Sequence, residues 1–102
     1  MPIMTNPFDP ADYLTDEESR AEYLRLSFES GDAAEIAEGL GTVARALGMS
    51  RIATDAHLSR PALYRALARD GNPSLDTILR VIKALDLQLT VRPAQRQSEP
   101  AS

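Results

Sequence analysis

Two short segments with the apolar spacing of helices lie side by side in the middle of the chain, and this pair limits the possible folds. The first runs from Ser50 to Ala56 and the second from Ser59 to Leu67, with His57 and Leu58 between them. Helices this short are unstable alone, so they must pack together and against longer helices. We therefore predict an all-α domain in which residues 50–67 form a helix-turn-helix.

Three longer segments supply the other helices. Each opens with a residue that can cap a helix, and glycine closes the first two. Gly39 and Gly41 lie inside the second of these helices, where each costs roughly 1 kcal/mol relative to alanine. Close packing against a neighbouring backbone is one explanation for them. The predicted ranges are 16–30, 32–48 and 74–85, preceded by a shorter turn over 10–14, with Ser50, Ser59 and Ser74 as caps of the last three helices.

The segment after the last helix alternates apolar and polar residues, which predicts a short half-buried β-strand that ends at Pro93. Its apolar members are Leu87, Leu89 and Val91. The free edge of such a strand can pair with a second copy of the chain, so we expect a homodimer. Helix packing is the alternative dimer surface. The predicted organisation is a flexible N-terminus (1–8), one helical domain (9–92) and a disordered tail (93–102).

The distribution of charge is more informative than the net charge of −4. Residues 1–44 hold ten acidic and two basic side chains, whereas residues 45–83 hold seven basic and three acidic ones. The basic part coincides with the predicted helix-turn-helix. The acidic part is either a solvated face or a surface for a basic partner.

The second short helix presents a basic side that suits the major groove of DNA. Arginine can donate two parallel hydrogen bonds to guanine, and hydroxyl groups at helix starts can contact phosphates. Surface solvation is the alternative for any single arginine, but the set together favours DNA. The candidate DNA-binding residues are Ser50, Arg51, Ser59, Arg60, Pro61, Tyr64, Arg65 and Arg69.

The first long helix carries an apolar stripe that includes Leu24 and Phe28, which we assign to the core. Tyr23 and Leu26 fall on its opposite side, on a face without charge. Scattered exposed apolar residues are common, and a partner-binding face is the alternative interpretation.

Several classes of protein are disfavoured. The chain has no cysteine and one histidine, His57, so a metal site or a histidine-based catalytic triad is not expected. No phosphate-binding loop or paired-carboxylate pattern stands out. Residues 1–8 lack the features of a signal peptide, and no segment is apolar enough to span a bilayer. We expect a cytoplasmic protein that is not an enzyme and uses no cofactor.

The same residues carry a resemblance to known families. Residues 49–85 resemble the Cro/C1-type (XRE) helix-turn-helix, and residues 8–92 are similar to the addiction-module antidote proteins. The matching motifs are Asp9 to Leu14, Glu22 to Leu24, Gly31-Asp32, Ile36-Ala37, Leu40-Gly41, Ala44 to Ala46, Gly48 to Ser50, Ile52-Ala53, Leu58 to Arg60, Ala62 to Tyr64 and Asp70 to Leu75.

The resemblance implies two functions: neutralising a small basic toxin of the RelE/ParE superfamily (HigB-like) and repressing the shared operon. A phage-type repressor without a toxin partner is the alternative. Tyr13, Tyr23, Leu26 and Phe28 are the expected toxin-binding residues. The family usually has glycine where this chain has His57, at a position that needs a positive φ; histidine adopts this geometry more readily than β-branched residues do. Glutamine is common in the family where this chain has Arg51.

Overall fold

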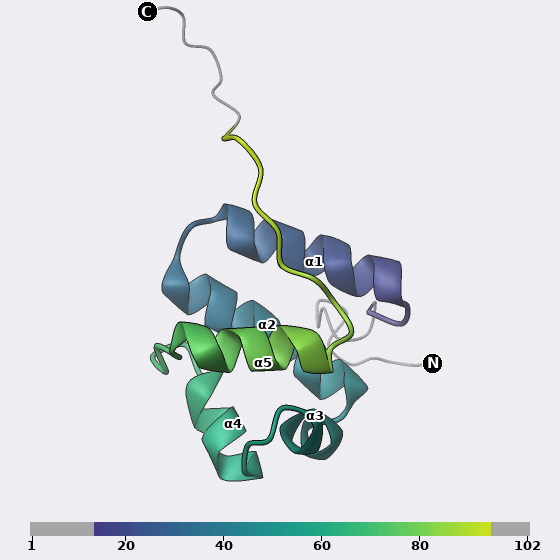
Figure 1. Ribbon diagram of the computed structural model, residues 1–102, viewed down its shortest axis with the longest axis vertical. Helices are drawn as coiled ribbons and strands as arrows, with labels where there is room; N and C mark the ends of the chain where they lie inside the picture. The colour runs from purple at the N-terminus through teal and green to yellow at the C-terminus, as the bar shows by residue number, and fades with distance from the viewer. Residues whose placement is uncertain (1–13, 95–102) are drawn as a thin grey trace, which may run out of the picture.

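The computed structural model describes residues 14–94, and these residues form an all-helical domain (Figure 1). Its helices are α1 (Glu17–Glu29), α2 (Ala33–Leu47), α3 (Met49–Asp55), α4 (Arg60–Ala66) and α5 (Leu75–Ala84). The five predicted helices are confirmed. Tyr13, most of the expected turn over 10–14, the N-terminal segment 1–8 and most of the tail lie outside the described residues.

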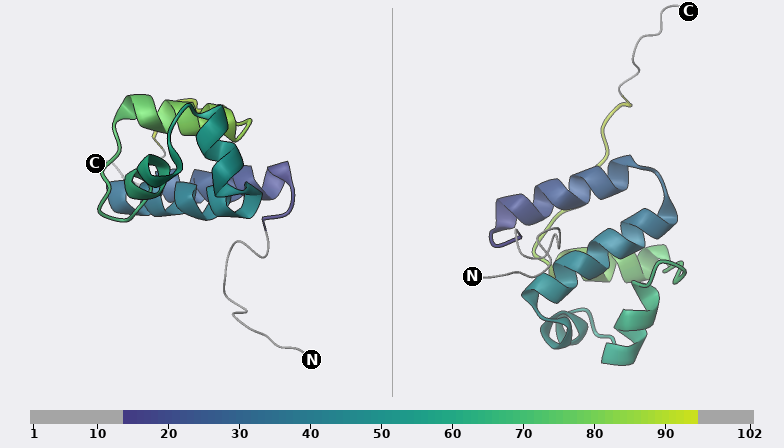
Figure 2. Two further views of the ribbon diagram at one scale, coloured as in Figure 1. Left: turned by 90° about the horizontal axis from the view of Figure 1, so that it is seen from below. Right: turned by 180° about the vertical axis from the view of Figure 1, so that it is seen from behind.

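The core lies where α2, α3, α4 and α5 meet. Its fully buried large side chains are Leu40 and Val43 from α2, Ile52 from α3, Leu63 from α4 and Val81 from α5. α1 lies along α2, and α3 contacts both α4 and α5. Figure 2 shows α1 and α2 side by side, with the short helices α3 and α4 on the side of α2 away from α1. α3 therefore packs against the longer helices α2 and α5, and α4 packs against α3.

α1 and α2 approach closely at Gly39, which explains one of the two glycines inside α2. A Cβ atom on Gly39 would lie 2.3 Å from Oγ and 2.9 Å from Cβ of Ser27 on α1. Two carbon atoms cannot approach that closely, so any larger residue at position 39 would push the two helices apart.

Gly48 alone joins α2 to α3, which corrects the prediction that Ser50 caps α3. Gly48 has φ +109°, ends α2 and is also the N-cap of α3. Its N–H donates to the carbonyl of Ala44, and its own carbonyl accepts from the N–H of Ile52. Ser50 is the second residue of α3 and is exposed. Position 48 supports this junction because glycine tolerates a positive φ.

The predicted strand over residues 87–92 is wrong for the single chain, because residues 14–94 contain no strand. α5 ends in a Schellman motif, with Asp86 at φ +62° and the N–H of Leu87 donating to the carbonyl of Ile82, 3.1 Å away. Leu87 packs against the core as the apolar residue that accompanies this motif. Beyond it the chain is extended and crosses α1, where Arg92 forms an ion pair with Glu29 at 2.9 Å (Figure 1).

Candidate nucleic-acid interface

α4 has one buried side and one exposed side. Leu63 is fully buried, and Leu67, just after the helix, is 5% exposed. Pro61, Tyr64 and Arg65 face solvent, and Tyr64 is 46% exposed. The exposed side therefore combines an aromatic ring with guanidinium groups, as the sequence predicts.

The start of α4 is fixed by Ser59. Its hydroxyl oxygen accepts a hydrogen bond of 3.1 Å from the N–H of Ala62, and its carbonyl accepts one of 3.0 Å from Leu63. Pro61 falls in the first turn, where its missing N–H removes no helical hydrogen bond. The predicted cap at Ser59 is confirmed, and it leaves the hydroxyl hydrogen of Ser59 free to donate.

The turn between α3 and α4 is a Schellman motif with histidine at the left-handed position. His57 has φ +60°. Its N–H donates to the carbonyl of Thr54 at 3.1 Å, and the N–H of Leu58 donates to Ala53 at 2.9 Å. The positive φ expected at His57 is confirmed. Leu58 is the apolar residue of the motif and packs against the core.

Arg80 of α5 donates hydrogen bonds to backbone carbonyls of this turn. This residue was not identified from the sequence. Its Nη1 lies 3.3 Å from the carbonyl oxygen of His57 and 3.4 Å from that of Ala56. Asp76 fixes the same guanidinium with contacts of 3.1 Å and 3.0 Å. Only the Asp76–Arg80 spacing of four residues is visible in the sequence; the contact with a turn 23 residues away depends on the fold.

Arg60 and Tyr64 form a pair along the exposed side of α4. The guanidinium carbon of Arg60 lies 5.5 Å from the centre of the Tyr64 ring, which is within the range of a cation–π contact. Nη2 of Arg60 also donates to the Tyr64 hydroxyl at 3.3 Å. The pair limits the freedom of both side chains on the face that would meet a ligand.

The remaining arginines of the predicted interface differ in their partners. Within residues 14–94, no acidic side chain lies within ion-pair distance of Arg65, whereas Arg51 has a long contact of 3.8 Å with Asp55. Arg69 is bound to Glu38 of α2 at 2.6 Å. The hydrogen bond that Arg69 donates to Glu38, with the negative charge of Glu38, Asp32 and Glu35, raises the pKa of the Arg69 guanidinium.

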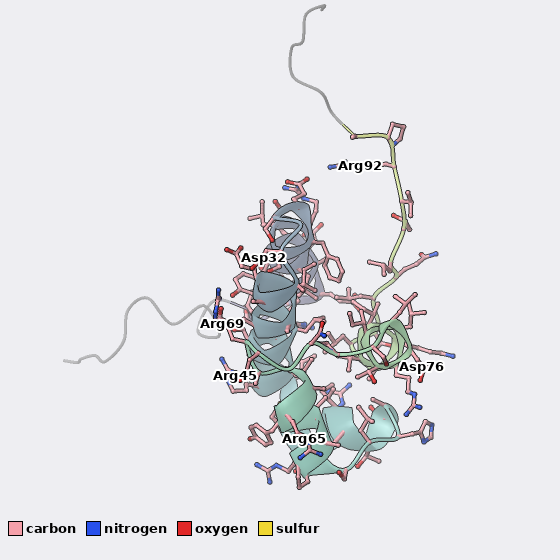
Figure 3. All side chains as sticks on the ribbon, turned by 90° about the vertical axis from the view of Figure 1, so that its left-hand side faces the viewer. Asp32, Arg45, Arg65, Arg69, Asp76 and Arg92 are labelled. Atoms are coloured by element: carbon pink, nitrogen blue, oxygen red, sulfur yellow. The ribbon has the colours of Figure 1, made fainter. Side chains whose placement is uncertain are left out.

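The position of Arg69 differs from that of Arg65. Figure 3 shows Arg69 on the flank of α2, between Asp32 and Arg45, and Arg65 below them on α4. Arg69 was predicted as a DNA-binding residue, but in this structure its guanidinium binds a carboxylate. The sequence gives no sign of this pairing, since 31 residues separate the two side chains.

The predicted partner-binding residues of α1 fall on two sides of the helix. Leu26 is 54% exposed and shares a groove with Tyr23, which is partly buried. Phe28 packs against the core and lines a different hollow, beneath the extended segment after α5. Tyr13 lies outside the described residues. Of the three predicted residues that the structure describes, Tyr23 and Leu26 are the two that share a surface.

Residues 14–94 contain neither a candidate membrane span nor a candidate metal site. No helix there has both the length and the apolar character needed to cross a bilayer. No group of three histidine, cysteine or carboxylate side chains is gathered there in a way that could hold a metal ion.

Comparison with known proteins identifies one family and one close relative. The family model described as "Probable addiction module antidote protein" matches residues 4–93. A protein of Haemophilus influenzae (strain Rd), described as uncharacterized, is 45% identical over 85 residues, which cover 83% of this chain and 88% of that protein. No solved structure matches.

Proposed function

We propose that this chain, which belongs to the family of probable addiction module antidote proteins, is the antitoxin of a type II toxin–antitoxin module. In this proposal it neutralises a small basic toxin of the RelE/ParE superfamily and represses its own operon by sequence-specific binding to DNA. It acts in the cytoplasm and has no enzymatic activity. Family membership supports the antitoxin role, and the geometry of α4 supports the binding of DNA.

The observation that carries DNA binding is the exposed side of α4, where Arg65 has no acidic partner within residues 14–94. An α-helix fits the major groove of B-DNA, and a free guanidinium can bind both acceptors on a guanine edge. In the Cro/C1 arrangement that we propose for α3 and α4, α4 enters the groove. Arg60 and Tyr64 then contact bases or phosphates, and Ser50, Arg51 and Ser59 contact phosphates.

We also propose that the protein acts as a homodimer on a palindromic operator, with half-sites about one turn of DNA apart. The extended segment after α5 supports this proposal. Val91 is 96% exposed and Leu89 is 39% exposed. A second copy that pairs with this segment would cover both side chains and satisfy its backbone hydrogen bonds.

Binding to the promoter upstream of its own gene tests the DNA-binding role. We expect the wild-type protein to bind that duplex more tightly than an unrelated duplex in a fluorescence anisotropy titration. Arg65→Ala should reduce this preference, because a lost base contact costs roughly 1–3 kcal/mol of discrimination. Arg25→Ala is the matched control: it removes one positive charge from α1, where Arg25 binds Glu22 and Glu29. Equal effects of the two substitutions would contradict the role of α4.

Co-expression with the product of the neighbouring reading frame tests the antitoxin role. We expect that product to be a small basic protein that stops growth alone and is harmless together with this chain. Promoter binding without a toxic neighbour would favour the alternative, a repressor that has no toxin partner.

A further inference from the structure

A groove on the surface lies between the Tyr23 and Leu26 side of α1 and the segment that follows α4. It lies between α1, α2 and the residues that follow α4, and its volume is about 440 Å³. Tyr23 and Leu26 line it from α1, and Arg69 lines it from the segment after α4. Its charged residues from α2 are Glu35, Glu38 and Arg45. An exposed leucine beside charged groups of both signs is a mixed apolar and charged surface, which suits a protein partner better than a small metabolite.

The charge of the surface around the groove indicates the charge of the partner. Residues 14–44 carry eight acidic and two basic side chains. Both basic side chains are already engaged: Arg25 binds Glu22 and Glu29, and Arg20 donates to the carbonyl of Leu14. The groove lies on an acidic flank, and within it Arg45 and Arg69 balance the charges of Glu35 and Glu38. This arrangement favours a partner segment with an apolar side chain for Leu26 and a cationic side chain that takes the place of Arg69 at Glu38.

We propose that this groove is the docking surface for the toxin and that Glu38 couples docking to DNA binding; this inference rests on the proposed function. Glu38 holds Arg69 at 2.6 Å, only three residues beyond the end of α4. A guanidinium or ammonium group of the toxin that binds Glu38 competes with Arg69 for the carboxylate.

Release of Arg69 changes the DNA-binding surface. The pair is exposed on both sides, with 59% of the Arg69 side chain and 55% of the Glu38 side chain accessible, so little energy opposes its opening. A freed Arg69 lies next to α4 and is available to a DNA phosphate. Docking of the toxin therefore strengthens DNA binding, and by thermodynamic linkage DNA strengthens toxin binding.

The salt dependence of binding to the promoter duplex tests the link between Glu38 and Arg69 without the toxin. Glu38→Gln should bind more tightly and increase the magnitude of the slope of log K against log salt by about 0.9, which corresponds to one added phosphate contact. Glu35→Gln is the matched control, since it removes the same charge from the same groove but no bond to Arg69. In an Arg69→Ala background, Glu38→Gln should leave the slope unchanged. Equal slopes for Glu38→Gln and Glu35→Gln would overturn the inference.

A second titration adds the product of the neighbouring reading frame. This protein should tighten DNA binding by the wild-type chain and produce no comparable gain with Glu38→Gln. Leu26→Asp should weaken toxin binding at least tenfold, about 1.4 kcal/mol, and leave DNA binding by the free chain unchanged. Unchanged toxin affinity in Leu26→Asp and Glu38→Gln would overturn the docking surface. Failure of the wild-type chain to bind either ligand would instead overturn the proposed function itself.

Discussion

Arg80 of α5 and His57 of the turn before α4 are joined by a hydrogen bond of 3.3 Å from the guanidinium to the backbone carbonyl. The turn orients α4, and α4 carries the exposed Arg65. The direction of the candidate DNA-binding helix therefore depends on α5 as well as on the neighbouring α3.

Removal of the Arg80 side chain should loosen this turn. We expect Arg80→Ala to lower the free energy of unfolding by about 1–2 kcal/mol, because two carbonyl groups lose a charged donor. Asp76→Asn is the control, since it weakens an exposed ion pair worth about 0.5 kcal/mol and keeps the guanidinium. Urea unfolding measures both variants, and equal losses would show that the contact with the turn contributes nothing.

Glycine should be better than histidine at position 57. A residue with a Cβ atom is strained at positive φ, so His57→Gly should raise the free energy of unfolding by about 0.5–1 kcal/mol after the entropic cost of glycine. His57→Ala, which keeps the Cβ atom, should not stabilise. Asp86 ends α5 with φ +62°, and Asp86→Gly repeats the test at a second Schellman motif. A stability loss in both glycine variants would contradict this account.

Because α1 and α2 approach closely at Gly39, the effect of Gly39→Ala on stability should change sign when Ser27 is replaced. Gly39→Ala should destabilise the protein by about 1–3 kcal/mol, because its Cβ atom would collide with Ser27. In a Ser27→Gly background the same substitution should stabilise by up to about 1 kcal/mol, since the colliding atoms are gone and alanine favours the helix. Thermal unfolding of the four proteins measures the coupling. The same sign in both backgrounds would argue against contact at this point.

The N-cap of α1, Asp16, should make the free energy of unfolding depend on pH in the acidic range. Asp16 accepts a hydrogen bond of 2.7 Å from the N–H of Ser19, which is the first cause of a lowered pKa for this carboxyl. A carboxyl with a lower pKa in the folded state stabilises the fold above its unfolded pKa. This contribution is lost as the pH falls through the folded pKa.

Asp16→Ser separates this effect from capping itself. Serine also caps a helix but carries no titrating carboxyl, so this part of the acid dependence should vanish in the variant while the helix remains capped. Unfolding curves between neutral and acidic pH make the comparison. Identical acid dependence of the two proteins would assign the effect to other carboxyl groups.

Local signals in the sequence predicted most of the fold. The predicted caps at Asp32, Ser59 and Ser74 are confirmed, because each uses a side chain and a backbone N–H three residues later. The positive φ at His57 followed instead from the family resemblance, in which glycine usually holds this position. These features require no knowledge of distant contacts.

The errors arose where a distant contact or a competing local motif decided the outcome. Alternation from Leu87 onward predicted a strand, but the Schellman motif of α5 places Leu87 against the core, and no strand among residues 14–94 pairs with the residues that follow. The binding of Arg69 to Glu38 joins two segments that only the packed fold brings together. The contact of Arg80 with the turn at His57 was missed for the same reason, since the two segments meet only in the packed fold.

Gly48 belongs to two helices at once, so no spacer separates the long helices from the pair that carries the interface. One residue inserted there would change the orientation of α3 and α4 relative to α2 while leaving each helix intact. The direction in which Arg65 faces is therefore encoded in the length of this junction as much as in the chemistry of any side chain.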